Sequence, residues 1–244
     1  MGRVLWHLGY PDQAVRCSQQ AIAIAEEISH AFSLAAALSW DAALHQLRRE
    51  AGQTLEAAKA DLALTTEQII PFFAAQGMVL RGWALVEQGR CDEGTAGLRA
   101  GIDAYRATGA NLETSQWLAL LAEACGRVGR TDEALAIVRE ALAGIESSGI
   151  RYHEAELYRL EGELSLGRDD ERSAACFCRA IEIARAQQAK SLELRAALGL
   201  ARLWLRQDRR KEARELLTPI YGWFTEGFDT ADLKDAKALL DELT

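Results

Sequence analysis

Apolar residues recur along almost the whole chain at the three- and four-residue spacing of amphipathic helices. Leu118, Leu121, Ala122 and Cys125 are one example, and this spacing places them on one face of a helix. The alternating apolar and polar pattern of a half-buried strand is nearly absent. The chain is therefore predicted to be all-α.

Short polar phrases interrupt the apolar pattern at a nearly fixed interval. Their first residues are separated by 43, 37, 40, 38 and 41 residues, and they are Gly9, Gly52, Gly89, Gly129, Gly167 and Asp208. A period of this length is typical of a solenoid, in which each repeat packs on its neighbours. Such an array offers a long binding surface rather than an enclosed catalytic pocket.

Each phrase has the composition of a turn between two antiparallel helices. A glycine after an apolar run can adopt the left-handed conformation that ends a helix, and an Asp or Thr a few residues later can cap the next one. Acidic residues such as Asp132 and Glu133 favour the positive end of the new helix. We therefore expect each leading glycine to end a helix and a capped helix to follow it.

The phrases divide the chain into about six helix pairs and a closing helix. The second pair covers about residues 30–68, and the next four begin near Pro71, Asn111, Arg151 and Ser191. Pro219 is expected to kink or break the last of these pairs. A helix over about 230–243, capped by Thr230, is expected to close the stack against water. We expect a single domain over residues 1–244.

The first pair is incomplete, because few residues precede Gly9. This beginning suggests that the chain is the C-terminal part of a longer polypeptide, or a short product of one. The apolar edge of the truncated pair is expected to fray or to be buried in a homodimer.

Small residues recur where neighbouring helices must approach closely. Gly82, Ala122 and Ala201 each lie seven positions before a turn phrase. Together with small residues after the turn, this arrangement resembles the tetratricopeptide repeat, although the usual period of that repeat is about 34 residues. The resemblance implies a right-handed α-solenoid. A two-helix repeat of the HEAT type, with a period near 40, is the alternative.

Composition excludes several classes of function. The net charge of −8 argues against nucleic acid and acidic membranes as partners. The five cysteines lack the spacing of a secreted disulfide scaffold, and no signal peptide or membrane-length apolar run is present. We expect a cytoplasmic protein with reduced thiols.

The motifs of common enzymes are missing. There is no phosphate-binding loop of the Walker type and no Gly-x-Ser-x-Gly elbow. His153 and Glu154 begin like a zinc-protease helix, but Leu157 stands where the second histidine would be needed. Cys176 and Cys178 would diverge on a helix and could not hold one metal together. No catalytic, metal or cofactor site is predicted.

The first helices of a tetratricopeptide-like array line its concave groove, and this register selects candidate binding residues. The groove is expected to hold an exposed tryptophan beside a polar wall that becomes basic toward the C-terminus, which suits a protein or peptide partner of acidic character. An ordinary salt-bridged surface is the alternative for the basic residues. The candidates are Gln76, Trp83, Glu87, Gln116, Glu123, Arg127, Arg195, Arg202 and Arg206.

Four phrases resemble a particular group of repeat proteins. They are LRGWAL (80–85), YHEAELYRL (152–160), QQAKSLELR (187–195) and YGWFTEGFDTADL (221–233). They are similar to the C-terminal repeat region of large bacterial signalling proteins that combine a class III adenylate/guanylate cyclase domain, or a DNA-binding domain, with a predicted ATPase. The resemblance implies a regulatory, protein-binding module that carries no catalytic residue. A sensing array of a transcription regulator, with a partner or small ligand between repeats, is the alternative.

Overall fold

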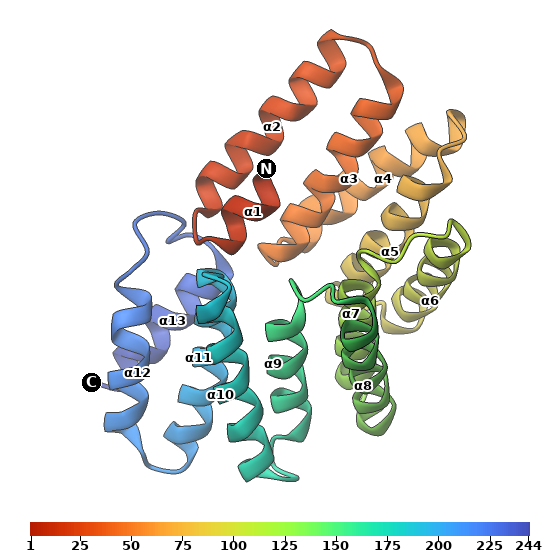
Figure 1. Cartoon of the computed structure of the whole chain (residues 1–244). Helices are drawn as coiled ribbons and strands as arrows, with labels where there is room; N and C mark the ends of the chain where they lie inside the picture. Colours follow the sequence, from red (N-terminus) through yellow and green to blue (C-terminus); the bar gives the residue numbers. More distant parts are fainter. The chain divides into compact units, whose positions relative to one another are not determined.

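The computed structural model describes all 244 residues, and its only regular elements are α-helices joined by short connections (Figure 1). The helices pack in consecutive pairs, followed by one closing helix. The all-α array of about six helix pairs with a C-terminal helix is therefore confirmed. In chain order the helices are α1 (Gly2–His7), α2 (Pro11–Glu27), α3 (Ala31–Leu47), α4 (Ala51–Glu67), α5 (Pro71–Glu87), α6 (Cys91–Ala107), α7 (Thr114–Arg127), α8 (Thr131–Ser148), α9 (Glu154–Ser165), α10 (Asp170–Ala186), α11 (Lys190–Arg206), α12 (Arg210–Tyr221) and α13 (Ala231–Glu242).

The chain forms two compact units. Unit 1 comprises Met1–Trp6 and Asp12–Ile137, and unit 2 comprises His7–Pro11 and Val138–Thr244. The single domain expected from the repeat stays a prediction.

The turn phrases end helices as expected at four of the five leading glycines. Gly9, Gly89, Gly129 and Gly167 have φ values of 90°, 84°, 78° and 76°, in the left-handed region that favours glycine. Gly52 is the exception, because it lies inside the first turn of α4. Arg49, with φ of 63°, takes the left-handed position there.

Side-chain capping of the following helices is rarer than expected. Asp169 does cap α10, since its carboxylate accepts a hydrogen bond of 2.9 Å from the backbone N–H of Arg172. The residue before α6 is Arg90, whose side chain makes no cap. Thr230 stands at the N-cap position of α13, but its hydroxyl donates to the Gly227 carbonyl instead. The prediction of Asp or Thr caps is therefore correct for α10 and wrong for α6 and α13.

Glycines bring α5 and α6 of unit 1 into close contact. A Cβ atom on Gly82 would lie 2.7 Å from the backbone nitrogen of Leu98, and one on Gly94 would lie 2.6 Å from the carbonyl oxygen of Gly82. These distances are shorter than any ordinary van der Waals contact. The close approach predicted at Gly82 is confirmed, and it depends on a second glycine across the contact.

Phe177 occupies the corresponding place in unit 2. Its ring is fully buried between α9 and α11, where Gly162 and Gly199 leave room for it. A Cβ atom on Gly199 would lie 2.4 Å from the ring. Here the space comes from glycines on two first helices, and one aromatic side chain fills it.

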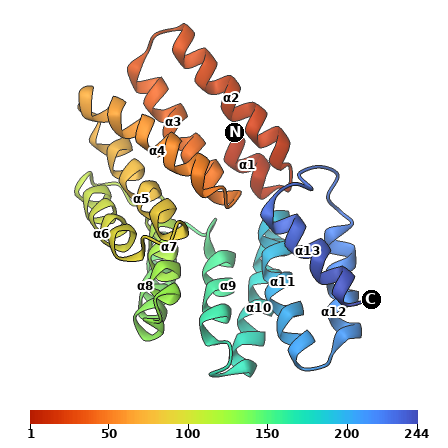
Figure 2. The ribbon, with the colours of Figure 1, turned by 180° about the vertical axis from the view of Figure 1, so that it is seen from behind.

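The end of unit 2 is closed by α13. This helix contacts α11 and α12 and lies beside them in both views (Figures 1 and 2). Leu233, Ala236 and Leu239 of α13 are buried in the same core cluster as Leu217 of α12. The expected break at Pro219 falls at a helix end, because α12 stops at Tyr221, two residues later.

Candidate partner-binding face

The first helices of successive pairs contact one another directly within each unit. In unit 1, α5 contacts both α3 and α7, and in unit 2, α11 contacts both α9 and α13. We call the surface that these helices form the first-helix face of each unit. The predicted groove residues lie on these helices, on α5, α7 and α11.

A chain of hydrogen bonds crosses three first helices of unit 1. Ser39 of α3 donates from its hydroxyl to the Gln76 side-chain oxygen at 2.8 Å, and the Gln76 amide nitrogen donates to Glu113 at 2.5 Å. Arg3 donates to the other carboxylate oxygen of Glu113 at 2.6 Å. We call Ser39, Gln76, Glu113 and Arg3 the unit 1 ladder. Within it, Ser39 and Gln76 are 37 residues apart in the sequence, and so are Gln76 and Glu113.

Three predicted groove residues are buried rather than exposed. Gln76, Trp83 and Gln116 expose 1%, 3% and 2% of their surface. The expectation of an exposed tryptophan at position 83 is wrong. The physical reason is that neighbouring first helices touch, so each covers side chains that would face open solvent on an isolated helix pair.

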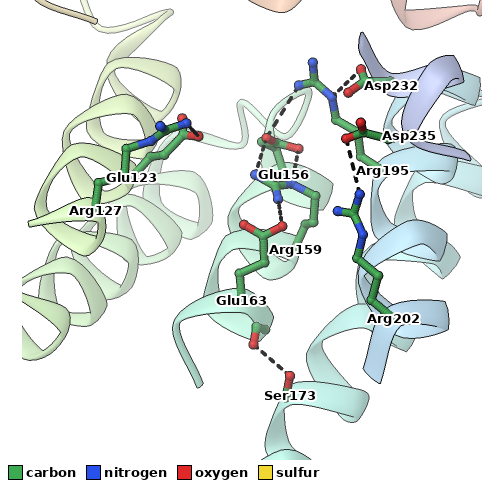
Figure 3. Close-up of polar contacts among 11 residues, drawn as sticks. Glu123, Arg127, Glu156, Arg159, Glu163, Ser173, Arg195, Arg202, Asp232 and Asp235 are labelled. Atoms are coloured by element: carbon green, nitrogen blue, oxygen red, sulfur yellow. Dashed lines mark hydrogen bonds and ion pairs between the residues drawn. The ribbon is translucent and has the colours of Figure 1, made fainter. Parts of the chain in front are cut away.

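Glu87, Glu123 and Arg127 do come together, at the C-terminal ends of α5 and α7. An Arg127 nitrogen lies 2.6 Å from a Glu87 oxygen. It also lies 3.5 Å from a Glu123 oxygen (Figure 3). Burial, followed by the negative charge of Glu123, raises the pKa of Glu87 despite its contact with Arg127. These three residues are partly open to solvent and form a mixed-charge edge of the face.

A second ladder crosses the first helices of unit 2. Arg159 donates two hydrogen bonds to Glu156 of the same helix, at 2.8 and 2.9 Å, and also pairs with Glu163. Arg195 of α11 lies 3.7 Å from Glu156 and donates to Asp232 of α13 at 2.8 Å (Figure 3). We call Glu156, Arg159, Arg195 and Asp232 the unit 2 ladder.

The ladder strongly favours the ionised form of Glu156. Burial alone would raise the pKa of this carboxyl, but the positive charges of Arg159 and Arg195 and the hydrogen bond from Arg159 lower it to about 2. Glu156 is therefore a fixed negative charge between two arginines. It is not available as a proton donor or acceptor near neutral pH.

Arg202 and Arg206 continue from Arg195 along α11 toward solvent. Their side chains are 51% and 53% exposed. Arg202 lies 3.2 Å from Asp235, and Arg206 lies 4.0 Å from Asp170. Each of these arginines thus has a carboxylate neighbour, and the basic character expected of the face toward its C-terminus stays a prediction.

The acidic members of this surface were not predicted from the sequence. Glu156, Asp232 and Asp235 lie on α9 and α13, one on each side of α11. Arg195 and Asp232 are 37 residues apart, the same spacing that joins Ser39, Gln76 and Glu113. That recurring interval between polar residues was the signal that could have found Asp232, whereas Glu156 and Asp235 lie at other intervals from their arginines.

No group of three or more His, Cys, Asp or Glu side chains is placed to hold a metal ion. Cys176 is buried and Cys178 is exposed, so these two thiols face different surroundings, as their spacing on a helix predicts. None of the helices combines the length and the hydropathy needed to cross a membrane.

Solved structures share this architecture at low sequence identity. A Rap protein complexed with Competence and Sporulation Factor matches 99% of this chain and 72% of its own, with a TM-score of 0.69 and 13% identity. BtubC (BKLC) from P. vanneervenii matches 96% of this chain and 89% of its own, with a TM-score of 0.58 and 14% identity. A kinesin light chain with nearly identical TPR-like repeats from Podosopora anserina matches 76% of this chain and 92% of its own, with a TM-score of 0.52 and 16% identity.

These likenesses define the fold as a TPR-like helical repeat. No protein-family model matches the chain. An uncharacterized protein of Rhizobium meliloti (strain 1021) is 27% identical over 194 residues, which cover 79% of this chain and 19% of that protein. The chain therefore spans about a fifth of the length of the curated relative that it matches.

Proposed function

We propose that this chain is a regulatory protein-interaction module that binds a peptide or a partner domain on its first-helix face. The observation that carries the proposal is the pair of exposed arginines on α11, Arg202 and Arg206. Each is held by a single carboxylate at 3.2 Å or more, in contrast to the buried ladder beside them. Exposed ion pairs of this kind contribute about 1 kcal/mol or less, so a partner carboxylate can replace the internal one at little cost.

The buried ladder complements these exchangeable arginines. Glu156, Arg159, Arg195 and Asp232 fix the side chains at the centre of the surface by contacts across three helices. A surface whose side chains are already ordered loses less conformational entropy when a partner binds. Fixed charges at the centre and exchangeable charges at the margin favour a partner with acidic groups that reach Arg202 and Arg206.

One structural likeness and a general property of the fold support binding of a partner as the general role. The Rap protein of similar fold was solved in complex with Competence and Sporulation Factor. TPR-like arrays present extended surfaces that suit peptides and protein segments. Enzyme activity is not proposed for this chain.

A larger signalling protein is the proposed setting. The relative from Rhizobium meliloti is about five times as long as the region that it shares with this chain, which leaves room for other domains. The four phrases that resemble repeat regions of cyclase and ATPase signalling proteins favour such a parent. A sensing array of a transcription regulator is the alternative, and the coding sequence upstream of Met1 distinguishes a cyclase or ATPase domain from a DNA-binding domain.

The binding proposal is tested by reversing the charge of the two arginines. Random 12-residue peptides are selected on the immobilised chain, and the Kd values of the recovered peptides are measured by fluorescence anisotropy. The double variant Arg202→Glu/Arg206→Glu is expected to raise the Kd of acidic peptides at least about tenfold, because two attractive charges become repulsive. Raising the salt concentration is expected to reduce the difference.

The matched control reverses two exposed arginines on second helices, Arg179→Glu/Arg214→Glu, and is expected to leave the Kd values unchanged. Recovery of no peptide, or of peptides that bind the Arg202 and Arg206 variant as well as the original chain, would argue against this face. Clear ATP hydrolysis or cyclic nucleotide synthesis by the purified chain would refute the non-catalytic role.

A further inference from the structure

Asp61, on the second helix α4 of unit 1, is a carboxyl group without a partner. The residue is 0% exposed, and neither of its carboxyl oxygens has a hydrogen-bond partner. Buried polar groups in native proteins are nearly always hydrogen-bonded, so an unpaired carboxyl calls for a physical reason. The ladders and the exposed ion pairs do not involve it.

Asp61 stands where the next three second helices carry a small residue. Counting on by the repeat spacing of 40, 40 and 39 residues, the equivalent positions are Gly101, Ala141 and Ala180. The small residues allow the second helix to approach the first helices closely. An aspartate at this position needs extra space in the helix that faces it.

Gly77 of α5 supplies that space. A Cβ atom on Gly77 would lie 2.7 Å from a carboxyl oxygen of Asp61 and 3.0 Å from Leu62. At this contact the small residue therefore lies on α5, opposite Asp61. The two residues form a complementary pair, which we call the Asp61–Gly77 contact.

Both members of the contact are costly. A glycine inside a helix destabilises it by about 1 kcal/mol relative to alanine, and a buried carboxyl without a partner is costly as well. Two such residues that meet in one place weaken the α4–α5 packing more than any single defect would. This contact is therefore suited to open under a specific condition.

The charged groups on the helices around α4 do not neutralise Asp61. The helices that pack against α4 are α3 and α5. On α3, Asp41 and His45 lie 3.5 Å apart, and on α5, Arg81 pairs with Glu93 and Glu87 with Arg127. Burial is the one cause that raises the pKa of Asp61, to about 8.

We propose that the Asp61–Gly77 contact is a pH-sensitive switch in unit 1, shut while the carboxyl is neutral and opened when it ionises. A neutral carboxyl can remain in the apolar contact, whereas a carboxylate gains hydration by leaving it. Opening separates α4 from α5. Because Gln76 of the unit 1 ladder immediately precedes Gly77, the switch acts on the first-helix face, although it does not depend on the proposed partner.

Hydrogen exchange of the whole chain tests the switch. Amide protection in α4 and α5 is followed from pH 6 to pH 9 and corrected for the intrinsic exchange rate. Opening releases one proton below pH 8, so protection is expected to fall about tenfold per pH unit up to about pH 8 and to level off above it. Amides of α9 and α11 in unit 2 serve as the internal reference and are expected to keep their protection.

Two variants separate the carboxyl from the packing. Asp61→Asn keeps the shape of the neutral acid but cannot ionise, and Asp61→Ala restores a residue type found at equivalent positions of other repeats. In both, protection of α4 and α5 is expected to be independent of pH. Asp103→Asn, which removes an exposed carboxylate on α6, is expected to keep the original pH dependence.

A substitution at Gly77 tests the close packing of the Asp61–Gly77 contact. Gly77→Ala is expected to weaken protection of α4 and α5 at least about tenfold in the original chain, because its Cβ would collide with the Asp61 carboxyl. In the Asp61→Ala background the same change is expected to weaken protection much less, because only the flexible Leu62 side chain then has to move aside. Equal pH slopes in the original chain and in Asp61→Ala would overturn the switch, as would additive effects of the two substitutions.

Discussion

Glu156 and Asp61 are both buried carboxyl groups, yet their pKa values move in opposite directions. Glu156 accepts two hydrogen bonds from Arg159 and lies near Arg195, so its pKa falls to about 2. Asp61 has no such partner, and burial raises its pKa to about 8. At the residue scale, the neighbours of a carboxyl decide whether burial favours its charged or its neutral form.

Replacing Glu156 with glutamine is expected to lower the free energy of unfolding at pH 7 by about 3 kcal/mol, because the buried Arg159 and Arg195 each lose one of their two counter-charges. The folded-state pKa of Glu156 is depressed, so its contribution is present above the ordinary pKa of about 4.5 and is lost as the pH falls through about 2. Urea unfolding at pH 7 and at pH 3 measures this contribution. The difference in the free energy of unfolding between the original chain and Glu156→Gln is expected to be smaller at pH 3.

The exposed Glu171→Gln change on α10 is the control and is expected to alter stability by less than about 0.5 kcal/mol. A Glu156→Gln penalty that stayed constant from pH 7 to pH 3 would mean that lost packing, rather than lost charge, causes it. The sequence alone could not indicate these roles. Glu156 and Asp61 are separate acids in helical segments until the fold places arginines beside one and a glycine beside the other.

At the element scale, the contact of α5 with α6 depends on the absence of side chains. Gly82→Ala raises the helix propensity of α5 by about 1 kcal/mol, yet its Cβ would lie 2.7 Å from the Leu98 backbone nitrogen. Backbone cannot move aside as a flexible side chain can. We expect a net loss of about 2 kcal/mol in the free energy of unfolding, measured by urea denaturation.

Gly144 on α8 provides the matched substitution, because a Cβ there meets nothing within 4 Å. Gly144→Ala is expected to stabilise the chain by up to about 1 kcal/mol. If both substitutions stabilised the protein equally, the close approach of α5 and α6 would not limit its packing.

The existence and order of the helices could be predicted from the sequence, because period and turn glycines are local signals. Gly9, Gly89, Gly129 and Gly167 behave as expected. The residue with left-handed backbone before α4 could not be predicted, because it is Arg49 and not a glycine. The prediction that Trp83 is exposed was wrong for a different reason. Contact between first helices depends on how the helix pairs stack and not on the sequence of any one helix.

On the scale of the whole molecule, the helix pairs interact chiefly with their neighbours, as expected for a repeat array. Phe177 joins α9, α10 and α11 within unit 2, whereas Gly82 and Gly94 join α5 and α6 within unit 1. A defect in one of these contacts is therefore expected to weaken its own unit first.

Gly199→Val tests this locality. The new side chain would begin 2.4 Å from the Phe177 ring, so it must displace a fully buried aromatic group. We expect hydrogen exchange to accelerate at least tenfold in α9, α10 and α11, while α4, α5 and α6 keep their protection. Gly82→Val is expected to give the reverse pattern. Equal acceleration in both units after either change would show that the array unfolds as one cooperative body. Contacts between neighbouring repeats would then not be enough to account for its stability.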